Sequence, residues 1–233
     1  RTDELDTIQC KKVIDQIAEV NPNAFLILTG GEPLLRPDIY ELIRYAADKK
    51  FMVVLGTNGT LINEANAKKI KAAGAHGVGI SIDSMDATKH NKFRGVTGAW
   101  EHSMEAFNVL NEVGVDFLIQ MSVSDMNYRE IPDVVAFTEK IGAIAFNLYF
   151  LVCTGRGQGN TDISNEAYEE ALKLLYEQQM KYKGRLMINS KCAPQYKRVV
   201  YENDPDSVYT RTYSGGCPAG TLPSRAPFPL LYV

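Results

Sequence analysis

Two hydrophobic patterns alternate along the first 150 residues. Short apolar runs, typical of buried parallel strands, alternate with longer segments in which apolar residues recur every three or four positions, as on one face of a helix. The runs predict strands over residues 24–29, 51–56, 77–82, 116–123 and 143–152. The longer segments predict helices over about residues 5–21, 38–49, 63–73, 98–113 and 131–141. Such alternation indicates repeated βαβ units and a parallel sheet, either a barrel or a doubly wound open sheet.

The pattern changes after Gly159. A charged amphipathic helix is predicted from Glu166 to Tyr182, and a short strand over residues 185–189. From Ser190 onward the chain is rich in Pro, Gly, Tyr and polar residues, which predicts a loop-rich module with little core of its own. We therefore expect one α/β unit over residues 1–185 and a smaller module over residues 186–233.

Composition narrows the class of protein. The 233 residues are 45% hydrophobic, enough for a substantial core. The formal net charge of −3 argues against a general nucleic-acid or anionic-membrane surface. No apolar run approaches the roughly 20 residues that span a bilayer, and no signal peptide is visible. Four separated cysteines do not resemble a secreted disulfide framework. We expect a cytoplasmic protein without nucleic-acid or membrane partners.

The most informative motif follows the first predicted strand: Gly30, Gly31, Glu32 and Pro33. Adjacent glycines leave bare backbone groups at the strand end, Glu32 adds a negative charge, and Pro33 fixes the exit of the chain. Catalytic groups of α/β barrels lie at this carboxyl edge of the strands. On spacing alone the motif could also be a structural tight turn.

Polar residues also follow the next two strands. Thr57 and Asn58 end one of them, and Ser81 and Asp83 end the other. Hydroxyl, amide and carboxylate groups that meet at one sheet edge could bind a ribose, an amino group or a carboxylate. The alternative is that Asn58 belongs to a turn and Asp83 caps a helix, as is common at such junctions.

In this order, the motifs resemble those of the radical S-adenosylmethionine (radical SAM) enzymes over about residues 7–160. The matching segments are GGEP, Thr57-Asn58-Gly59, Ile80-Ser81-Ile82-Asp83, Phe93-Arg94-Gly95, Gly98-Ala99-Trp100 and Leu151 to Gly157. The resemblance implies a partial (β/α)6 barrel followed by a SPASM- or twitch-like extension. It also implies two cofactors, S-adenosylmethionine and a catalytic [4Fe-4S] cluster.

The family's cluster-binding motif, CxxxCxxC, does not occur in these 233 residues. The resemblance implies that this motif and the first strand lie upstream of Arg1, and that the chain as given lacks activity without them.

The resemblance also assigns residues to the cofactor. Arg94, expected in a loop after the strand at 77–82, could pair with the methionine carboxylate or an acidic substrate, or be an ordinary surface arginine. The implied cofactor-binding residues are Gly30, Gly31, Glu32, Pro33, Thr57, Asn58, Ser81, Asp83, Arg94 and Leu151.

Substrate contacts are expected after the last long strand. Arg156 lies between two glycines, which free the loop, and its planar guanidinium suits a carboxylate. Cys153 ends the strand and could face the barrel mouth, or it could be a small core residue. The segment FNLYFLVCTGRG is similar to the branch that matures haem-type tetrapyrroles. The implied function is generation of a 5′-deoxyadenosyl radical that modifies a tetrapyrrole or other cofactor precursor. The alternatives are thioether formation on a peptide and a non-catalytic binding module.

Cys192 and Cys217 lie in the loop-rich module, where the resemblance implies ligands of an auxiliary [4Fe-4S] cluster. Such modules need further cysteines, and none follows Cys217. Cys10 is expected to be a partly buried helical thiol. The three histidines have no metal-ligand spacing and are expected at the surface or in loops: His76, His90 and His102. The implied partners are a small-molecule or peptide substrate and a one-electron reductant such as ferredoxin or flavodoxin.

Overall fold

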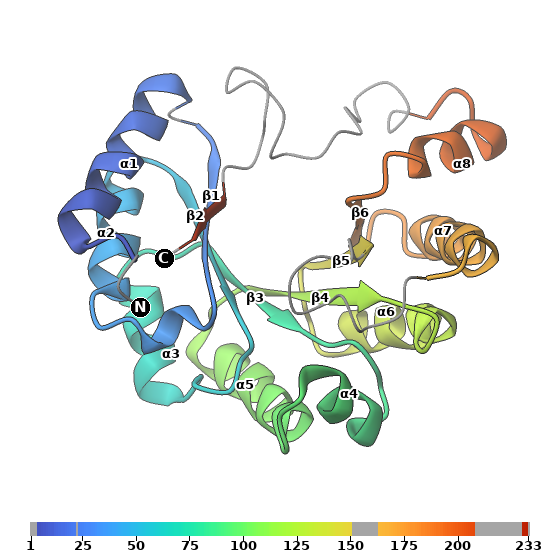
Figure 1. The fold of residues 1–233 in the computed structure, drawn as a ribbon, viewed down its shortest axis with the longest axis horizontal. Coiled ribbons are helices and arrows are strands. Elements are labelled where there is room, and N and C mark those ends of the chain that lie inside the picture. The colour runs from blue at the N-terminus through green and yellow to red at the C-terminus, as the bar shows by residue number, and fades with distance from the viewer. Residues whose placement is uncertain (1–3, 22, 151–162, 208–229, 233) are drawn as a thin grey trace. The chain divides into compact units, whose positions relative to one another are not determined.

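The computed structural model describes residues 4–21, 23–150, 163–207 and 230–232 (Figure 1). The chain divides into two compact units, which we describe separately. The first comprises Arg1–Ile80, Glu101–Phe117 and Pro218–Val233, and the second comprises Ser81–Trp100 and Leu118–Cys217.

The first unit is built on four parallel strands in the order β7-β1-β2-β3. Its strands are β1 (Phe25–Thr29), β2 (Met52–Thr57), β3 (Gly77–Ser81) and β7 (Leu230–Tyr232). Its helices are α1 (Thr7–Val20), η1 (Pro33–Leu35), α2 (Ile39–Asp48), α3 (Glu64–Ala72) and most of α5 (Ala99–Val113). In register, Phe25 of β1 lies opposite Met52 of β2, and Val54 of β2 opposite Gly77 of β3.

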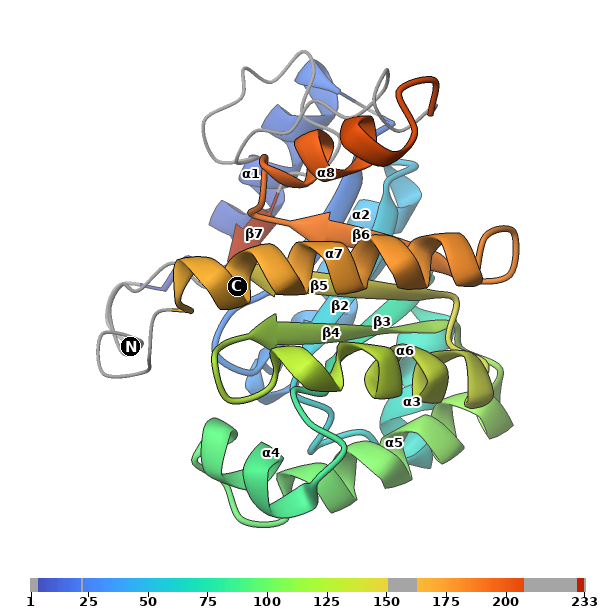
Figure 2. The same cartoon turned by 90° about the vertical axis from the view of Figure 1, so that its right-hand side faces the viewer.

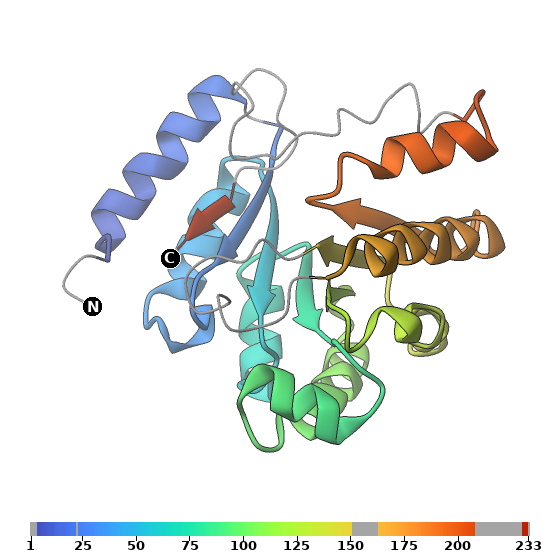
Figure 3. The same cartoon turned by 45° about the vertical axis from the view of Figure 1, so that its right-hand side comes forward.

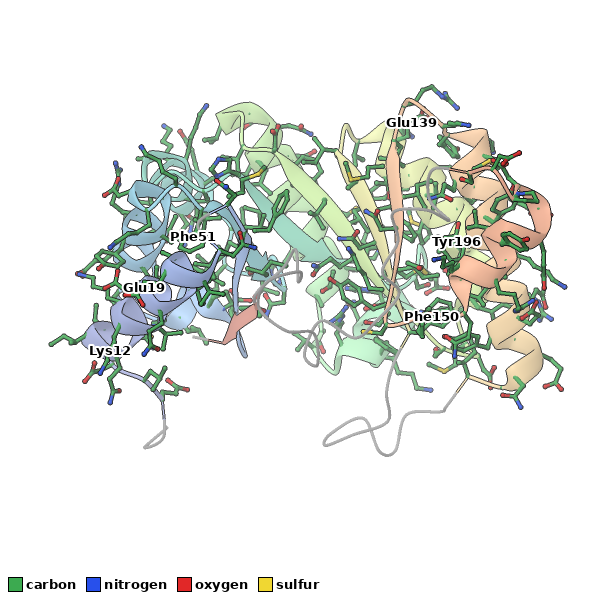
Figure 4. All side chains as sticks on the ribbon, turned by 90° about the horizontal axis from the view of Figure 1, so that it is seen from above. Lys12, Glu19, Phe51, Glu139, Phe150 and Tyr196 are labelled. Carbon is green, nitrogen blue, oxygen red and sulfur yellow. The ribbon has the colours of Figure 1, made fainter. Side chains whose placement is uncertain are left out.

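Amphipathic helices close the core of this unit. The apolar face of α2 (Ile39, Leu42, Ile43 and Ala46) is fully buried, and α2 packs against β2 beside α1 and α3 (Figure 1). Phe51, which precedes β2 and is labelled in Figure 4, is fully buried as well. At the start of α1, a capping box pairs Asp6 and Gln9 and satisfies backbone N–H groups that the helix leaves unpaired.

The second unit contains three parallel strands in the order β4-β5-β6. They are β4 (Phe117–Val123), β5 (Ala145–Phe150) and β6 (Met187–Lys191). Its helices are α4 (Ala87–Arg94), η2 (Tyr128–Glu130), α6 (Ile131–Lys140), α7 (Asn165–Lys181) and α8 (Tyr196–Asn203).

One face of these three strands is covered by helices. Figure 2 shows α6 and α7 in front of the strands, and Figure 3 shows α8 beside α7. The ring of Phe150 in β5 lies 4.3 Å, centroid to centroid, from that of Tyr168 in α7. Tyr196 of α8 is fully buried and donates a hydrogen bond to Oε1 of Gln179 in α7. Figure 4 labels Phe150 and Tyr196.

The predicted strands and long helices are confirmed, and the ends that lie within the described ranges are shifted by at most two residues. The short strand predicted at 185–189 forms at 187–191 and pairs in parallel with β5. One prediction is wrong: the segment containing Arg94 is a helix, α4, rather than a loop. The sequence pattern also missed α8, a helix within the segment predicted to be loop-rich, which buries Val199 and Val200.

Candidate functional site

In the first unit, Glu32 joins the ends of two neighbouring strands. Its Oε1 accepts hydrogen bonds from the Thr57 hydroxyl (2.7 Å) and the Leu34 amide (3.1 Å), while its Oε2 accepts one from the Asn58 amide (2.9 Å). The side chain thereby caps η1, whose first residue, Pro33, is buried. Both carboxylate oxygens are used within the protein, so Glu32 holds the turn after β1 against the end of β2.

The glycine before Glu32 is open. Gly31 is exposed, and a Cβ built on it would meet no atom within 4 Å. Its φ lies outside the left-handed region. A ligand can therefore approach the Gly31 backbone directly. The structure brings together six of the predicted residues in this unit, namely Gly30, Gly31, Glu32, Pro33, Thr57 and Asn58.

In the second unit, Asp83 is the centre of a buried hydrogen-bond network. The residue is 1% exposed. Its Oδ1 accepts from the Ser122 amide (2.9 Å), and its Oδ2 accepts from Nε of Arg94 (2.5 Å). Asn127 donates to the backbone oxygens of Asp83 and Ser122, both at 2.8 Å. Asp83 does not cap α4, since that position belongs to Asp86. Its carboxylate holds Arg94 of α4 beside the Ser122 amide of β4.

Arg94 is the last residue of α4, not a loop residue as predicted. The helix forms because Asp86 caps its start and Gly95, in the left-handed region at φ 66°, ends it. The Arg94 side chain keeps 28% of its surface exposed. It can therefore contact a ligand while Asp83 holds its Nε.

The three histidines differ in burial. His90 is buried (1% exposed) in α4, which corrects the prediction of a surface or loop residue, and its Nδ1 accepts the Asp83 amide at 3.1 Å. His76 and His102 are exposed, as predicted.

Cys10 is buried in α1, where burial raises the pKa of its thiol.

Glu130, a carboxylate that the sequence analysis did not single out, contacts the two residues that follow Asp83. Oε2 of Glu130 accepts from the Ser84 hydroxyl (2.6 Å) and the Met85 amide (2.9 Å), and its Oε1 pairs with Lys89 at 2.9 Å. Burial alone would raise the Glu130 pKa, but these hydrogen bonds and the Lys89 charge lower it. The rule that pointed to the other strand ends, polar residues just beyond an apolar run, would also have found Asn127 after β4.

The remaining predicted residues are scattered or lie outside the described residues. Ser81, the last residue of β3, is partly exposed. Cys192 is exposed just after β6, in the left-handed region at φ 58°. Within the described ranges, no three His, Cys, Asp or Glu side chains come together as a metal site. Four predicted residues lie outside the described ranges: Leu151, Cys153, Arg156 and Cys217.

Two further observations concern the surface. A cavity of about 580 Å³ lies between α3 and α5 in the first unit, and its lining includes Glu64, Lys68, Lys71 and Glu112. None of the predicted site residues line it. Over the part of the chain that the structure describes, we find no helix with both the length and the apolar character needed to cross a bilayer.

Comparisons with known proteins place these features in a family. The model of the radical SAM superfamily matches residues 1–138. The AdoMet-dependent heme synthase of Methanosarcina barkeri is 38% identical over 226 residues, covering 94% of this chain and 64% of the relative. The pre-heme d1 synthase of Dinoroseobacter shibae is 31% identical over 209 residues, covering 88% of this chain and 50% of the relative.

A solved structure supports the fold. Streptococcus suis SuiB bound to S-adenosylmethionine superposes with a TM-score of 0.69 at 17% identity, covering 98% of this chain and 52% of SuiB. The predicted radical SAM-type α/β fold is therefore confirmed. The chain spans 64%, 61% and 58% of the length of three heme synthase relatives. Family model, relatives and fold agree, and the chain belongs to the radical SAM superfamily.

Proposed function

We propose that this protein is a radical SAM enzyme that modifies a tetrapyrrole or a related cofactor precursor. The observation that carries the proposal is the turn after β1, where Glu32 is fixed by Thr57 and Asn58 while the Gly31 backbone stays open. Three relatives with 37–38% identity are named AdoMet-dependent heme synthase, and these support the tetrapyrrole as substrate.

The turn fits the amino end of S-adenosylmethionine. Exposed backbone at Gly31 can accept hydrogen bonds from an ammonium group, and Glu32 adds negative charge beside it without leaving its own partners. When bound together with an iron–sulfur cluster, this cofactor supplies the radical chemistry that such enzymes use on unreactive C–H bonds. The protein's part is to bind, orient and exclude water.

In the second unit we assign Arg94 to a carboxylate and Ser81 to a hydroxyl or amino group of the cofactor. Asp83 has a positioning role in this proposal, because both of its oxygens are occupied and it is 1% exposed. The Asp83 contact holds Nε of Arg94, and the partly exposed guanidinium can direct its other N–H groups to the ligand.

Roles for the other predicted residues extend the proposal. Leu151 contributes to the cofactor site, and Arg156 with Cys153 to the substrate site. Cys192 and Cys217 are ligands of an auxiliary cluster in a module over residues 186–233. The exposed position of Cys192 after β6 is compatible with that role. A ferredoxin or flavodoxin supplies the electron.

A second candidate function is peptide modification. The subtilosin biosynthesis protein AlbA of Bacillus subtilis is 30% identical over 171 residues, covering 73% of this chain and 38% of AlbA.

One experiment separates the two candidates. The full-length protein, with its iron–sulfur cluster reconstituted and reduced by dithionite, is incubated with S-adenosylmethionine and either an iron porphyrin with four carboxylates or a leader-bearing precursor peptide. The proposal expects 5′-deoxyadenosine and a modified porphyrin by mass spectrometry. A modified peptide and an unchanged porphyrin would favour the second candidate. Cofactor that stays intact under both conditions would overturn both.

A further inference from the structure

One face of β4, β5 and β6 is turned away from α6 and α7, and polar residues are arranged on it in rows across the strands. Parallel register places its residues in three rows across the strands. The first row, at the amino end, is apolar: Leu118, Ala145 and Met187. The second row consists only of carboxamides: Gln120, Asn147 and Asn189. The third row, at the carboxyl end, is Ser122, Tyr149 and Lys191. Polarity therefore rises toward the strand edge where parallel sheets bind ligands.

Hydrogen bonds orient the groups of this face. Nδ2 of Asn189 donates to Oδ1 of Asn147 at 3.0 Å, and Nε2 of Gln120 donates to the Tyr149 hydroxyl at 3.4 Å. The first bond links two strands within the carboxamide row. The second crosses from the carboxamide row to the third row. The amides are thus held in fixed directions, as in a built binding surface.

Burial sets this face apart from both core and ordinary surface. Gln120, Tyr149, Asn189 and Lys191 are each partly buried, and Asn147 is buried at 8% exposed. The alternating residues on the helix side, such as Ile119 and Ile188, are buried and mostly apolar. Burying a row of amides wholly or in part costs free energy that burying an apolar row would not. A sheet that needs only stability has no use for such a row, whereas a polar ligand does.

Lys191 is the cationic residue of these three rows. Burial lowers the pKa of its ammonium group from the ordinary value, a cost that a bound carboxylate would offset. Lys191 lies opposite Tyr149 in register, at the carboxyl end of β6. The third row is also tied to Arg94, because the Ser122 amide donates to Asp83, which holds Arg94. The third row therefore contains one cationic side chain, Lys191, and is linked through Asp83 to a second, Arg94 of α4. Anionic groups are the ligands they suit.

We propose that this face is a subsite for the substrate, in which Lys191 pairs with a carboxylate and the row Gln120, Asn147 and Asn189 hydrogen-bonds the same carboxylate-bearing periphery. The inference deepens the proposed function and rests on it for the identity of the ligand as a tetrapyrrole. The apolar first row suits the ring of such a molecule, and the second and third rows suit its acidic side chains.

The probe for this subsite is coproporphyrin III, which bears four carboxylates, with its tetramethyl ester as the uncharged counterpart. Binding to the full-length protein is followed by porphyrin fluorescence. Lys191→Met should weaken binding of the acid roughly tenfold or more, as expected for a charge-assisted contact. Lys191→Arg should keep most of the affinity. The matched control is Lys183→Met, an exposed lysine near the amino end of β6, which should bind like wild type.

Asn189→Asp provides a second variant of almost unchanged shape. It places a negative charge in the carboxamide row. It should therefore weaken binding of the porphyrin acid but leave binding of its ester unchanged. Circular dichroism checks that each variant is folded. Wild-type affinity for the acid in both Lys191→Met and Asn189→Asp would overturn the subsite, as would an equal loss for acid and ester. Cleavage of S-adenosylmethionine is measured in a separate assay. If the cofactor is not cleaved, the proposed function is contradicted, while the porphyrin-binding result still tests the subsite.

Discussion

Arg94 donates its Nε–H to Oδ2 of Asp83 over 2.5 Å, and the two side chains differ sharply in exposure, at 28% and 1%. The aspartate follows β3, and the arginine ends α4 eleven residues later. A buried anion thus holds one edge of a guanidinium whose remainder reaches solvent. The pair fixes both the strand-to-helix connection and the direction of the arginine.

The first prediction concerns this pair. Asp83→Asn should destabilise the protein by about 2 kcal/mol, because it replaces one of the two oxygens that accept from the Ser122 amide and Arg94 by an NH2 donor. Urea unfolding followed by circular dichroism measures the change. Asp86→Asn is the matched control, since asparagine caps a helix as well as aspartate does. Equal midpoints for Asp83→Asn and wild type would show that the network carries no stability.

The second prediction concerns Glu32 and Thr57. Glu32→Gln and Thr57→Val should each cost about 1 kcal/mol, since each breaks hydrogen bonds of the turn. The double variant should cost less than the two single costs together, by about 0.5 kcal/mol or more, because both remove the same 2.7 Å contact. A double-mutant cycle in urea tests this. Strict additivity would contradict the direct coupling.

The third prediction uses the open space at Gly31. Gly31→Ala and Gly31→Leu should leave the unfolding midpoint nearly unchanged, because a Cβ there meets nothing within 4 Å. Their affinity for S-adenosylmethionine should fall progressively with side-chain size on the cluster-loaded, full-length protein. Scanning calorimetry measures the unfolding midpoint, and titration calorimetry measures the affinity for S-adenosylmethionine. Undiminished affinity in the leucine variant would remove the Gly31 backbone from the cofactor site.

The fourth prediction follows from the lowered pKa of Glu130. A depressed folded-state pKa contributes stability above the unfolded pKa of about 4.3, and this contribution is lost as the pH falls through the folded value. Near neutrality, the free energy of unfolding of the wild type should exceed that of Glu130→Gln by about 1–2 kcal/mol. This difference should disappear below about pH 4.

Urea unfolding of both proteins across this pH range checks the fourth prediction. Exposed Glu177→Gln on α7 is the control and should stay close to wild type throughout. A gap between wild type and Glu130→Gln that stays constant down to pH 3 would show that the Glu130 charge is not its source.

The sequence predicted the strands and the main helices because buried parallel strands and amphipathic helices leave strong periodic patterns. It also predicted that Glu32, Thr57 and Asn58 would meet, since parallel strands end at one edge. It did not reveal that both Glu32 oxygens are used internally, because no pattern records which way a carboxylate turns.

The two missed helices have different physical causes. α4 is mostly polar and buries one residue, His90, so it has no apolar stripe and depends on Asp86 and Gly95 for its ends. α8 spans eight residues, too short for its buried Tyr196, Val199 and Val200 to outweigh the surrounding loop-like composition. Buried polar residues and short helices are therefore where single-sequence patterns carry least information.

The parallel pair between β1 and β7 has a consequence for the order of folding. Ile27 lies opposite Leu230, and Thr29 opposite Tyr232, so this pair joins segments some two hundred residues apart. The β1–β2 pair closes a far shorter loop, since Phe25 lies opposite Met52. Closing the longer loop costs more conformational entropy, so the β1–β2 pair should form before the β1–β7 pair does.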